Sequence, residues 1–322
     1  MRAIVQDTYG PVGVLQLREI DQPAPKDDEV LLRVRAAGLD PGVWHLMSGL
    51  PYLLRLAYGL RRPRAPVRGT DVAGLVEAVG AKVTGVQPGA AVFGTCTGAF
   101  AEFACARDDR VAPKPANLSF EQAATVPVSA CAALHALRDQ GRVRQGQQVL
   151  VVGAAGGVGT FAVQPAKAFG AQVTGVCSTT KVDLVRSLGA DHVVDYTRDD
   201  PADGRRRYDL VLDLAGSRPL SHLRRALTPK GTLVLVGGEG GGRWLGGADR
   251  ALRALLLSPL VGQRLRGLLS TERREELETL RELIEAGKVT PVIDRSYPLR
   301  EVPDAIRRLE QGHARGKVAV TV

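Results

Sequence analysis

The chain has 322 residues, of which 44% are hydrophobic and 24% charged, with a formal net charge of +9. This length allows two domains with separate cores, and the composition is typical of a water-soluble globular protein. The longest apolar region, residues 251–260, is interrupted by Arg253 and Pro259, which excludes a bilayer-spanning helix. The positive charge is mostly arginine, spread from Arg2 to Arg315, so we favour solvated faces over a nucleic-acid surface.

Two features of the chain indicate a reducing cytoplasm. The first ten residues, MRAIVQDTYG, place charge and turn formers where a signal peptide needs an apolar stretch. The four cysteines are scattered without a C-x-x-C pair, which argues against a disulfide framework and against a structural zinc cluster. We therefore predict a cytoplasmic protein that does not associate with a membrane.

In chain order, residues 1–122 contain short β segments such as VLLRVRAAGL and DVAGLVEAVG, punctuated by Gly and Pro. From residue 123 onward, apolar strands alternate with amphipathic helices, which is typical of a parallel sheet covered by helices on both faces. The predicted strands are 148–153, 171–177, 192–196, 208–214 and 231–237. A charged helix follows at 272–287, a second helix lies near VPDAIRRLEQG, and KVAVTV forms a final strand.

The predicted fold class is therefore α/β. A β-rich domain occupies residues 1–122, and a doubly wound parallel-sheet domain occupies residues 123–262. Residues 263–322 return to the first domain.

Glycines cluster where the first strand of the second domain turns into a helix. Gly153, Gly156 and Gly159 have the spacing G-x-x-G-x-x-G, a variant of the commoner G-x-G-x-x-G. Glycine here allows a tight turn and a close backbone approach to a pyrophosphate, and the helix directs its unsatisfied N–H groups at the phosphates. A glycine-rich turn also serves packing, but its place between a strand and a helix favours a nucleotide diphosphate.

The end of the next predicted strand discriminates between the two nicotinamide cofactors. NAD sites usually present Asp or Glu there to the ribose 2′-hydroxyl. Here the strand ends in VCSTTK, without an acid until Asp183. Ser178, Thr179 and Lys181 offer hydrogen bonds and a positive charge to a 2′-phosphate, so we predict NADPH. A polar helix start with a Ser or Thr N-cap is an alternative that can hold at the same time.

These segments resemble those of the medium-chain dehydrogenase/reductase superfamily, in its zinc-free NADPH:quinone oxidoreductase branch. The resemblance covers essentially the whole chain and rests on GQQVLVVGAAGGVGTFAVQPAK (146–167), GLVEAVGAKVTGVQPGAAVFG (74–94), SLGADHVVDY (187–196) and GKVAVTV (316–322). It implies a GroES-like catalytic domain built from both chain ends and a Rossmann domain that binds NADPH. It also implies a homodimer paired through the edge of the Rossmann sheet.

The resemblance further implies roles for individual residues. Lys181 and Tyr196 match positions that hold the 2′-phosphate in NADPH-using members. Gly156, Gly157 and Val158 match the pyrophosphate lining. Two further strand ends face the cofactor, at Gly216 and Gly237. The full predicted cofactor-binding set is Gly153, Ala155, Gly156, Gly157, Val158, Gly159, Ser178, Thr179, Lys181, Tyr196, Gly216 and Gly237.

The zinc-dependent alcohol dehydrogenases of the same superfamily differ at their metal ligands. They have an early Cys or His, a G-H-E segment and a four-cysteine lobe. This chain has Asp40 at the first place and Thr70 at the histidine, and only Cys96 and Cys105 lie where the lobe would be. Catalytic zinc needs three protein ligands and an open position, so we predict that zinc is absent.

Without a metal, simple carbonyl reduction lacks the group that stabilises an alkoxide. A quinone or an α,β-unsaturated carbonyl (an enone) accepts hydride more easily because its charge spreads to a distant oxygen, so we predict such a substrate. The candidate catalytic residues lie in the segment 38–59: Asp40, at a position often Asn in relatives, His45 and Tyr52. Structural roles compete for each of them, and water is an alternative proton source.

Other functions remain open at this point. An enoyl-thioester reductase differs only in substrate size, and a zinc-free alcohol dehydrogenase-like enzyme is a further alternative. The net charge of +9 leaves room for a non-catalytic protein that binds NADPH or RNA. The sequence also contains a residue that is unfavourable in its predicted element. Pro165 lies inside the helix after the glycine turn, where it costs ~3 kcal/mol unless a kink is accommodated.

Overall fold

The structure is a computed structural model that describes residues 1–238, 242–312 and 314–322. Two compact units are present: unit 1 is Met1–Cys131, Thr271–Gly287 and Pro291–Val322, and unit 2 is Ala132–Ser270 and Lys288–Thr290. Both chain ends therefore belong to unit 1. The domain boundaries after residues 122 and 262 stay predictions. Within the described ranges, no helix combines the length and the apolar composition needed to cross a membrane.

Unit 2 contains one sheet of six parallel strands, in the order β10-β9-β8-β11-β12-β13. The strands are β8 (Gln148–Val152), β9 (Gln172–Cys177), β10 (His192–Asp195), β11 (Tyr208–Asp213), β12 (Leu227–Leu235) and β13 (Arg264–Gly267). The parallel sheet is confirmed. Strand β13 is absent from the predicted strands because only Leu265 of its four residues is buried, between two arginines.

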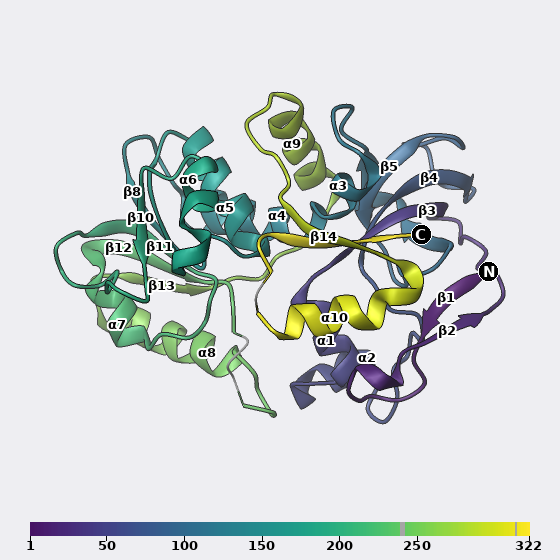
Figure 1. The fold of residues 1–322 in the computed structure, drawn as a ribbon, viewed down its shortest axis with the longest axis horizontal. Helices are drawn as coiled ribbons and strands as arrows, with labels where there is room; N and C mark the ends of the chain where they lie inside the picture. Colours follow the sequence, from purple (N-terminus) through teal and green to yellow (C-terminus); the bar gives the residue numbers. More distant parts are fainter. Residues whose placement is uncertain (239–241, 313) are drawn as a thin grey trace. The chain divides into compact units, whose positions relative to one another are not determined.

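Helices cover both faces of this sheet (Figure 1). One face carries α5 (Gly157–Ala168) and α6 (Val182–Ser187), and the other carries α7 (Leu220–Arg225) and α8 (Ala248–Leu257). Two adjacent residues of β9, whose side-chain positions point to opposite faces of the sheet, show which helices lie on each face. Val176 packs in one cluster with Leu223 of α7 and Ala254 of α8, whereas a Cβ on Gly175 would meet Val185 of α6. Because all strands are parallel, their carboxyl ends meet at one edge of the sheet.

Unit 1 is built on a seven-stranded sheet with the order β14-β15-β3-β4-β5-β7, and β6 also pairs with β3. The strands are β3 (Glu29–Leu39), β4 (Asp71–Val79), β5 (Ala91–Thr95), β6 (Phe103–Arg107), β7 (Val111–Pro113), β14 (Ile293–Pro298) and β15 (Lys317–Thr321). A separate two-stranded sheet is formed by β1 (Arg2–Val5) and β2 (Gln16–Glu19). The last strand of the chain, β15, pairs antiparallel with β3, so the sheet joins the two ends of the sequence.

The helices of unit 1 are short except near the carboxyl terminus. They are α1 (Pro41–Ser48), α2 (Arg55–Tyr58), α3 (Phe120–Ala124), α9 (Arg274–Glu285) and α10 (Val302–Glu310), and α4 (Pro127–Leu134) runs across the unit boundary. The predicted charged helix is α9, whose buried residues Leu277, Leu280 and Ile284 have the three- and four-residue spacing of one helix face.

Helix α5 continues for one turn beyond Pro165, so the proline is accommodated within the helix. Its neighbour Gln164 is buried and connects the helix to the segment Lys288–Thr290. The Gln164 amide nitrogen donates to Thr160 O at 2.8 Å and to Thr290 O at 3.0 Å, and its Oε1 accepts from Thr290 N at 2.8 Å. One side chain thus satisfies both backbone groups of Thr290.

We expect Gln164→Leu to destabilise the protein, because it leaves the Thr290 N–H and C=O without their partner. These hydrogen bonds are partly buried, and each one lost costs about 0.5–1.5 kcal/mol, so the urea midpoint falls while the m-value stays constant. Gln148→Leu is the matched control, since that amide bonds only to the exposed Gln172 side chain. Equal unfolding midpoints for the two variants would contradict this role of Gln164.

Candidate functional site

The glycine turn lies at the carboxyl end of β8, the strand at which the order of the sheet reverses. Gly153 has φ +92°, which is costly for any residue with a Cβ. The N–H groups of Gly153 and Ala154 both donate to Val176 O, at 3.1 and 3.0 Å. The turn is thereby fixed against the end of β9. Ligands of open α/β sheets bind outside the carboxyl ends of the strands at this kind of reversal.

Helix α5 begins at the turn without a side chain that caps its first N–H groups. Gly156 is its N-cap with φ −85° and ψ 179°, and no side chain caps it. The following residues Gly157, Val158 and Gly159 occupy the first helical positions, whose N–H groups have no acceptor within the helix. Ala155 precedes them and is buried. Uncapped N–H groups at the positive end of a helix of 12 residues fit a phosphate group.

Some of the predicted glycines are required by packing. A Cβ on Gly159 would lie 2.1 Å from Gly153 O, so Gly159 lets α5 approach the turn. A Cβ on Gly237 would lie 2.0 Å from Leu214 O, where the loops after β11 and β12 meet. Gly216 has φ +67°, and its N–H donates to Asp213 Oδ1 at 3.1 Å. Their contact with a cofactor stays a prediction.

Asp213 organises these two loops, and the sequence analysis does not single it out. Its carboxylate is buried and accepts from Arg250 Nη2 of α8 at 2.7 Å in addition to the Gly216 N–H. Its backbone oxygen accepts from Val236 N and Gly237 N. One residue therefore fixes both strand ends beside the glycine turn. A polar residue that ends an apolar strand, as in YDLVLD, is the signal that indicates it.

The remaining predicted cofactor residues lie at the ends of β9 and β10. Ser178 precedes the short helix η5 (Thr179–Lys181), which leads into α6. Tyr196 follows β10, is 53% exposed, and donates its N–H to Cys177 O at 3.1 Å. Hydroxyl, ammonium and phenol groups are thus present along one short stretch of the sheet edge, and these groups suit a phosphate.

An acid does reach this place, from the neighbouring strand. Asp195 ends β10 and pairs in register with Cys177 of β9. Its Oδ2 accepts the Thr179 hydroxyl at 2.5 Å, and its Oδ1 accepts the N–H of Thr197 at 3.0 Å. The bond from Thr179 is the main reason that the pKa of Asp195 is lowered. The sequence of β9 alone shows no acid before Asp183. Thr179 nevertheless contacts a carboxylate, because Asp195 reaches it from β10.

The three catalytic candidates come from one segment of unit 1. Asp40 is the N-cap of α1, and its Oδ1 accepts from Gly42 N at 2.7 Å. His45 lies on α1 with Nδ1 2.7 Å from Leu50 O, so Nδ1 carries the proton in that contact. Tyr52 begins the short helix η2 (Tyr52–Leu54), where the Arg55 guanidinium lies 4.8 Å from its ring centre. Asp40 precedes the helix with extended φ and ψ, and His45 begins its second turn, so α1 positions both residues.

A buried ionic network lies beside Asp40. Lys317 Nζ of β15 is 3.3 Å from Asp71 Oδ2 of β4 and 2.9 Å from Ser129 Oγ of α4. Asp71 Oδ1 accepts from Val128 N at 3.0 Å. Burial raises the pKa of Asp71 to about 7, opposed by the Lys317 ammonium and reinforced by the charge of Asp40. The sequence analysis does not pair Asp71 with Lys317, since 246 positions separate them.

The residues near Asp40 do not fit a zinc ion. Zinc binds thiolate, imidazole or carboxylate ligands, but burial raises the pKa of the Cys96 thiol far above its ordinary range. The Asp71 carboxylate is paired with an ammonium group. In the described part of the chain, no three His, Cys, Asp or Glu side chains gather as a metal site. The absence of zinc stays a prediction, and no step below uses a metal.

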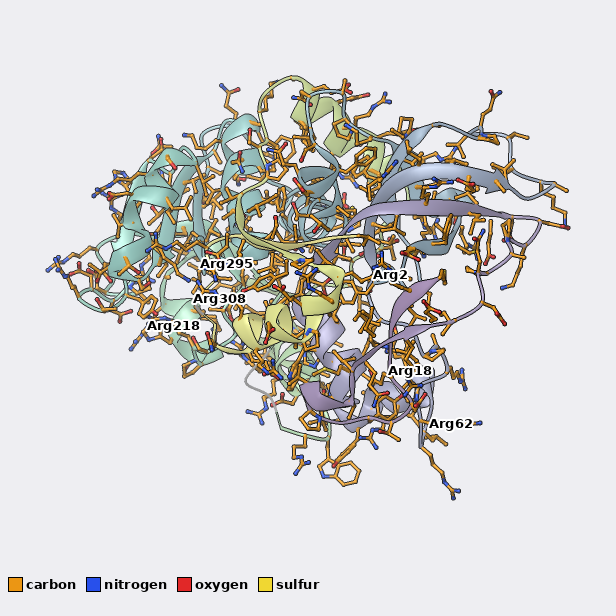
Figure 2. The ribbon with its side chains drawn as sticks, turned by 45° about the vertical axis from the view of Figure 1, so that its right-hand side comes forward. Arg2, Arg18, Arg62, Arg218, Arg295 and Arg308 are labelled. Carbon is orange, nitrogen blue, oxygen red and sulfur yellow. The ribbon has the colours of Figure 1, made fainter. Side chains whose placement is uncertain are left out.

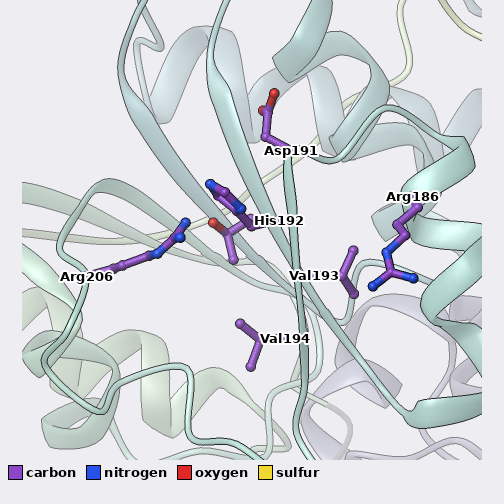
Figure 3. Close-up of a pocket in the computed structure, with 7 residues that line it drawn as sticks. Arg186, Asp191, His192, Val193, Val194 and Arg206 are labelled. Carbon is purple, nitrogen blue, oxygen red and sulfur yellow. The ribbon is translucent and has the colours of Figure 1, made fainter.

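Two cavities lie within the units. One of about 730 Å³ in unit 1 is lined partly by hydroxyl and thiol groups, from Thr70, Thr95, Cys96, Thr97 and Cys105. Another of about 350 Å³ lies along β10 in unit 2 (Figure 3), where Arg206 and Val194 are on one side of the strand and Arg186 and Val193 on the other. Neither cavity is lined by a predicted catalytic or cofactor residue.

The arginines are distributed over many elements (Figure 2). Several of the labelled ones form local ion pairs: Arg2 with Glu102, Arg18 with Asp7, Arg218 with Asp200 and Arg308 with Asp294. Such pairs are typical of solvated surfaces, where each contributes little to stability.

Two family models match the chain. The alcohol dehydrogenase GroES-like domain matches residues 26–116, and the model described as zinc-binding dehydrogenase matches residues 188–320. The predicted combination of a GroES-like domain with a parallel-sheet domain is confirmed.

Curated relatives and a solved structure extend over nearly all of the chain. It is 32% identical to the chloroplast envelope quinone oxidoreductase homolog of Arabidopsis thaliana, over 99% of this chain and 98% of that protein. It is 34% identical to the chloroplastic NADPH-dependent alkenal/one oxidoreductase of the same plant, over 99% and 79%. The structure of the quinone oxidoreductase from Coxiella burnetii matches with a TM-score of 0.88 and 31% identity, over 100% and 99%. The chain therefore belongs to the medium-chain dehydrogenase/reductase superfamily, in its quinone oxidoreductase branch.

Proposed function

We propose that this protein is an NADPH-dependent reductase of quinones or α,β-unsaturated carbonyls that works without zinc. The observation that carries the proposal is the uncapped start of α5 beside the positive-φ turn at Gly153, a backbone cradle that fits a pyrophosphate. The names of two similar proteins, a quinone oxidoreductase homolog and an NADPH-dependent alkenal/one oxidoreductase, support the reaction class.

The choice of NADPH rests on the groups at the ends of β9 and β10. In the proposal, Lys181, Ser178 and Tyr196 bind the 2′-phosphate by charge and by hydrogen bonds. Thr179 is held by Asp195, so its hydroxyl proton is already used and its contribution is to fix the turn. When bound, NADPH supplies the hydride that reduces the substrate.

A conjugated acceptor suits a protein without a Lewis acid. One matching model is described as zinc-binding dehydrogenase, yet the residues around Asp40 do not fit zinc. Hydride addition to a quinone or to the β-carbon of an enone moves negative charge onto a distant oxygen, so alignment of the reactants contributes much of the barrier reduction. The chain's task is then to position and desolvate the acceptor.

The segment that carries Asp40, His45 and Tyr52 is the proposed substrate side. His45 donates from Nδ1 to Leu50 O, so in the neutral imidazole the other ring nitrogen, Nε2, is an acceptor. Trp44 contacts the His45 ring edge-on at 5.0 Å and donates to Glu310 Oε1 of α10 at 2.7 Å. This bond fixes an aromatic face beside His45, which suits a flat acceptor.

We further propose that two copies of the chain pair through unit 2. The last strand of its sheet, β13, is an edge strand, and exposed leucines flank it: Leu255 and Leu256 on α8, Leu260 and Leu269. The most exposed of these, Leu269, is 91% accessible. A large apolar patch beside an unpaired strand edge is a place where a second chain binds. The cytoplasmic location stays a prediction.

The first experiment compares NADPH and NADH oxidation with a panel of quinones, enones, enoyl thioesters and simple ketones. We expect turnover of quinones or enones with NADPH that chelators do not change. Lys181→Ala removes a charge-assisted bond worth about 1.5–3 kcal/mol, so KM for NADPH rises by roughly ten- to a hundredfold while KM for NADH changes little. Lys230→Ala, at an exposed position, is the control. A protein that binds NADPH and reduces nothing in the panel would contradict the proposal.

Two glycine substitutions separate binding from folding at the turn. A Cβ on Gly156 meets only Gly153 O at 3.5 Å, so Gly156→Ala keeps the thermal midpoint but raises KM for both cofactors, because the methyl group blocks the phosphate approach. Gly159→Ala places its Cβ against backbone and destabilises the fold by about 1–3 kcal/mol. Calorimetry and cofactor titration measure the two effects. Normal NADPH binding by Gly156→Ala would argue against a pyrophosphate at this turn.

Light scattering after size exclusion tests the pairing. The wild type is expected at twice the chain mass of 34.2 kDa. Leu256→Arg together with Leu260→Arg places charge in the apolar patch and yields the single-chain mass. Leu17→Arg, at a leucine exposed on β2 in unit 1, leaves the mass unchanged. A wild type that elutes at the single-chain mass contradicts this part of the proposal.

A further inference from the structure

We propose that the pair of carboxyl groups Asp40 and Asp71 holds one proton beside Lys317 in the core of unit 1, and that this proton keeps Asp40 in place as the cap of α1. Asp71 and Lys317 are then positioning residues for α1, the helix that carries His45. The presence of this proton does not depend on any reaction. Its effect on catalysis rests on the proposed function.

The three charged groups lie in nearly water-free surroundings. Asp71 is fully buried, Lys317 is 2% exposed and Asp40 is 6% exposed. Asp71 is well supplied with donors, from Lys317 Nζ and Val128 N. Asp40 has one donor, Gly42 N, on its Oδ1. Its Oδ2 is buried and accepts from no donor in the described residues. A buried carboxylate oxygen without a donor is costly unless the group is protonated.

The register of the sheet brings the two carboxyl groups to the same face of the sheet. Gly38 of β3 pairs with Asp71 of β4, and a Cβ on Gly38 would lie 3.0 Å from Asp71 Oδ2. The missing side chain of Gly38 therefore leaves room for the Ala124 carbonyl group, at 2.3 Å, and for the Asp71 side chain. Asp40 follows two residues later with extended φ and ψ of −139° and 166°, so its side chain lies on the same face as that space, one strand repeat of about 6.7 Å along.

The charges of this cluster balance only with one added proton. Two carboxylates and one ammonium carry a net charge of −1, and a proton on either carboxyl makes the cluster neutral. The other groups that face Asp71 add no charge, since they are the Ser129 hydroxyl, the Val128 N–H and the Cys96 thiol, whose raised pKa keeps it protonated. Because an uncompensated buried charge is costly, the neutral form is favoured. Protonation also removes the charge repulsion between the two carboxyl groups.

The direction of the titration agrees with this arrangement. Burial and the Asp40 charge raise the pKa of Asp71 to about 7 despite the Lys317 ammonium. Between the ordinary pKa of an aspartate near 4 and this value, the folded chain holds a proton that the unfolded chain has released. This contribution to stability is therefore present at the acid end and is lost as pH rises through about 7.

Infrared difference spectra test for the proton directly. At pH 6, the wild type should show the C=O stretch of one protonated carboxyl group that Asp40→Asn and Asp71→Asn both lack, because either substitution leaves one carboxylate opposite Lys317. Asn is a good N-cap, so Asp40→Asn keeps α1. The control Asp294→Asn removes a carboxylate paired with Arg308 and leaves this band in place. A band that persists in either of the first two variants, or that the wild type lacks, overturns the proposal.

A second variant checks the role of the ammonium group. An opposite charge lowers a carboxyl pKa by about 1–3 units, so Lys317→Met should raise the pH at which the band disappears by about one unit or more. An unchanged or lower midpoint overturns the proposal.

Kinetics then connect the proton to α1. We expect wild-type kcat to fall above the infrared midpoint and Asp71→Asn, at a positioning residue, to lack this fall. A kcat that falls equally in both proteins overturns the positioning role. A protein that reduces no acceptor contradicts the proposed function alone, since the infrared result is independent of turnover.

Discussion

The close backbone approach between α5 and the turn after β8 is the constraint on which the candidate cofactor site depends. Gly153 turns the chain at φ +92°, and the missing side chain of Gly159 lets the helix reach the oxygen of Gly153. A bulkier residue at either place moves the start of α5 away from the sheet. The absence of side chains at these glycines permits this packing, and it also leaves the first N–H groups of α5 accessible to a phosphate. Packing and binding therefore require the same residues.

The sequence predicts the parts of the structure that depend on local pattern. Apolar runs separated by amphipathic helices indicate five of the six strands in unit 2, and the glycine spacing places the turn. The sixth strand, β13, escapes prediction because two of its four residues are arginines and its place depends on β12. Asp195 is missed as a neighbour of Thr179 because the two meet across strands. Sheet register, which local pattern does not specify, decides such contacts.

In the candidate substrate side, too, local sequence pattern predicts some features, and others depend on how the strands pair. Asp40 is recognisable from its place before Pro41 as a helix cap, and the structure gives it that role. Nothing local indicates that Asp71 and Lys317 lie beside it, since the network joins strands from opposite ends of the sequence. The reason for Gly38 is equally hidden, because it makes room for the Ala124 carbonyl group of α3 and for the Asp71 side chain on the adjacent strand. Chemistry that depends on burial and on charge balance becomes visible only when the strands are paired.

The position of β15 between β14 and β3 has a consequence for biosynthesis. A ribosome releases the chain from its amino end, so β3 exists long before the residues that pair with one of its edges. All of unit 2 is complete at Thr290, whereas Lys317 emerges 27 residues later. Until then β6 covers only Glu29–Arg33 on this edge, so Ala36–Leu39 stay unpaired there, and an unpaired strand edge is a known hazard for aggregation. Asp71 also lacks its counter-ion Lys317 until then. Unit 1 is therefore incomplete until β15 has emerged, and a truncation that removes β15 leaves the carboxyl half of β3 without this partner.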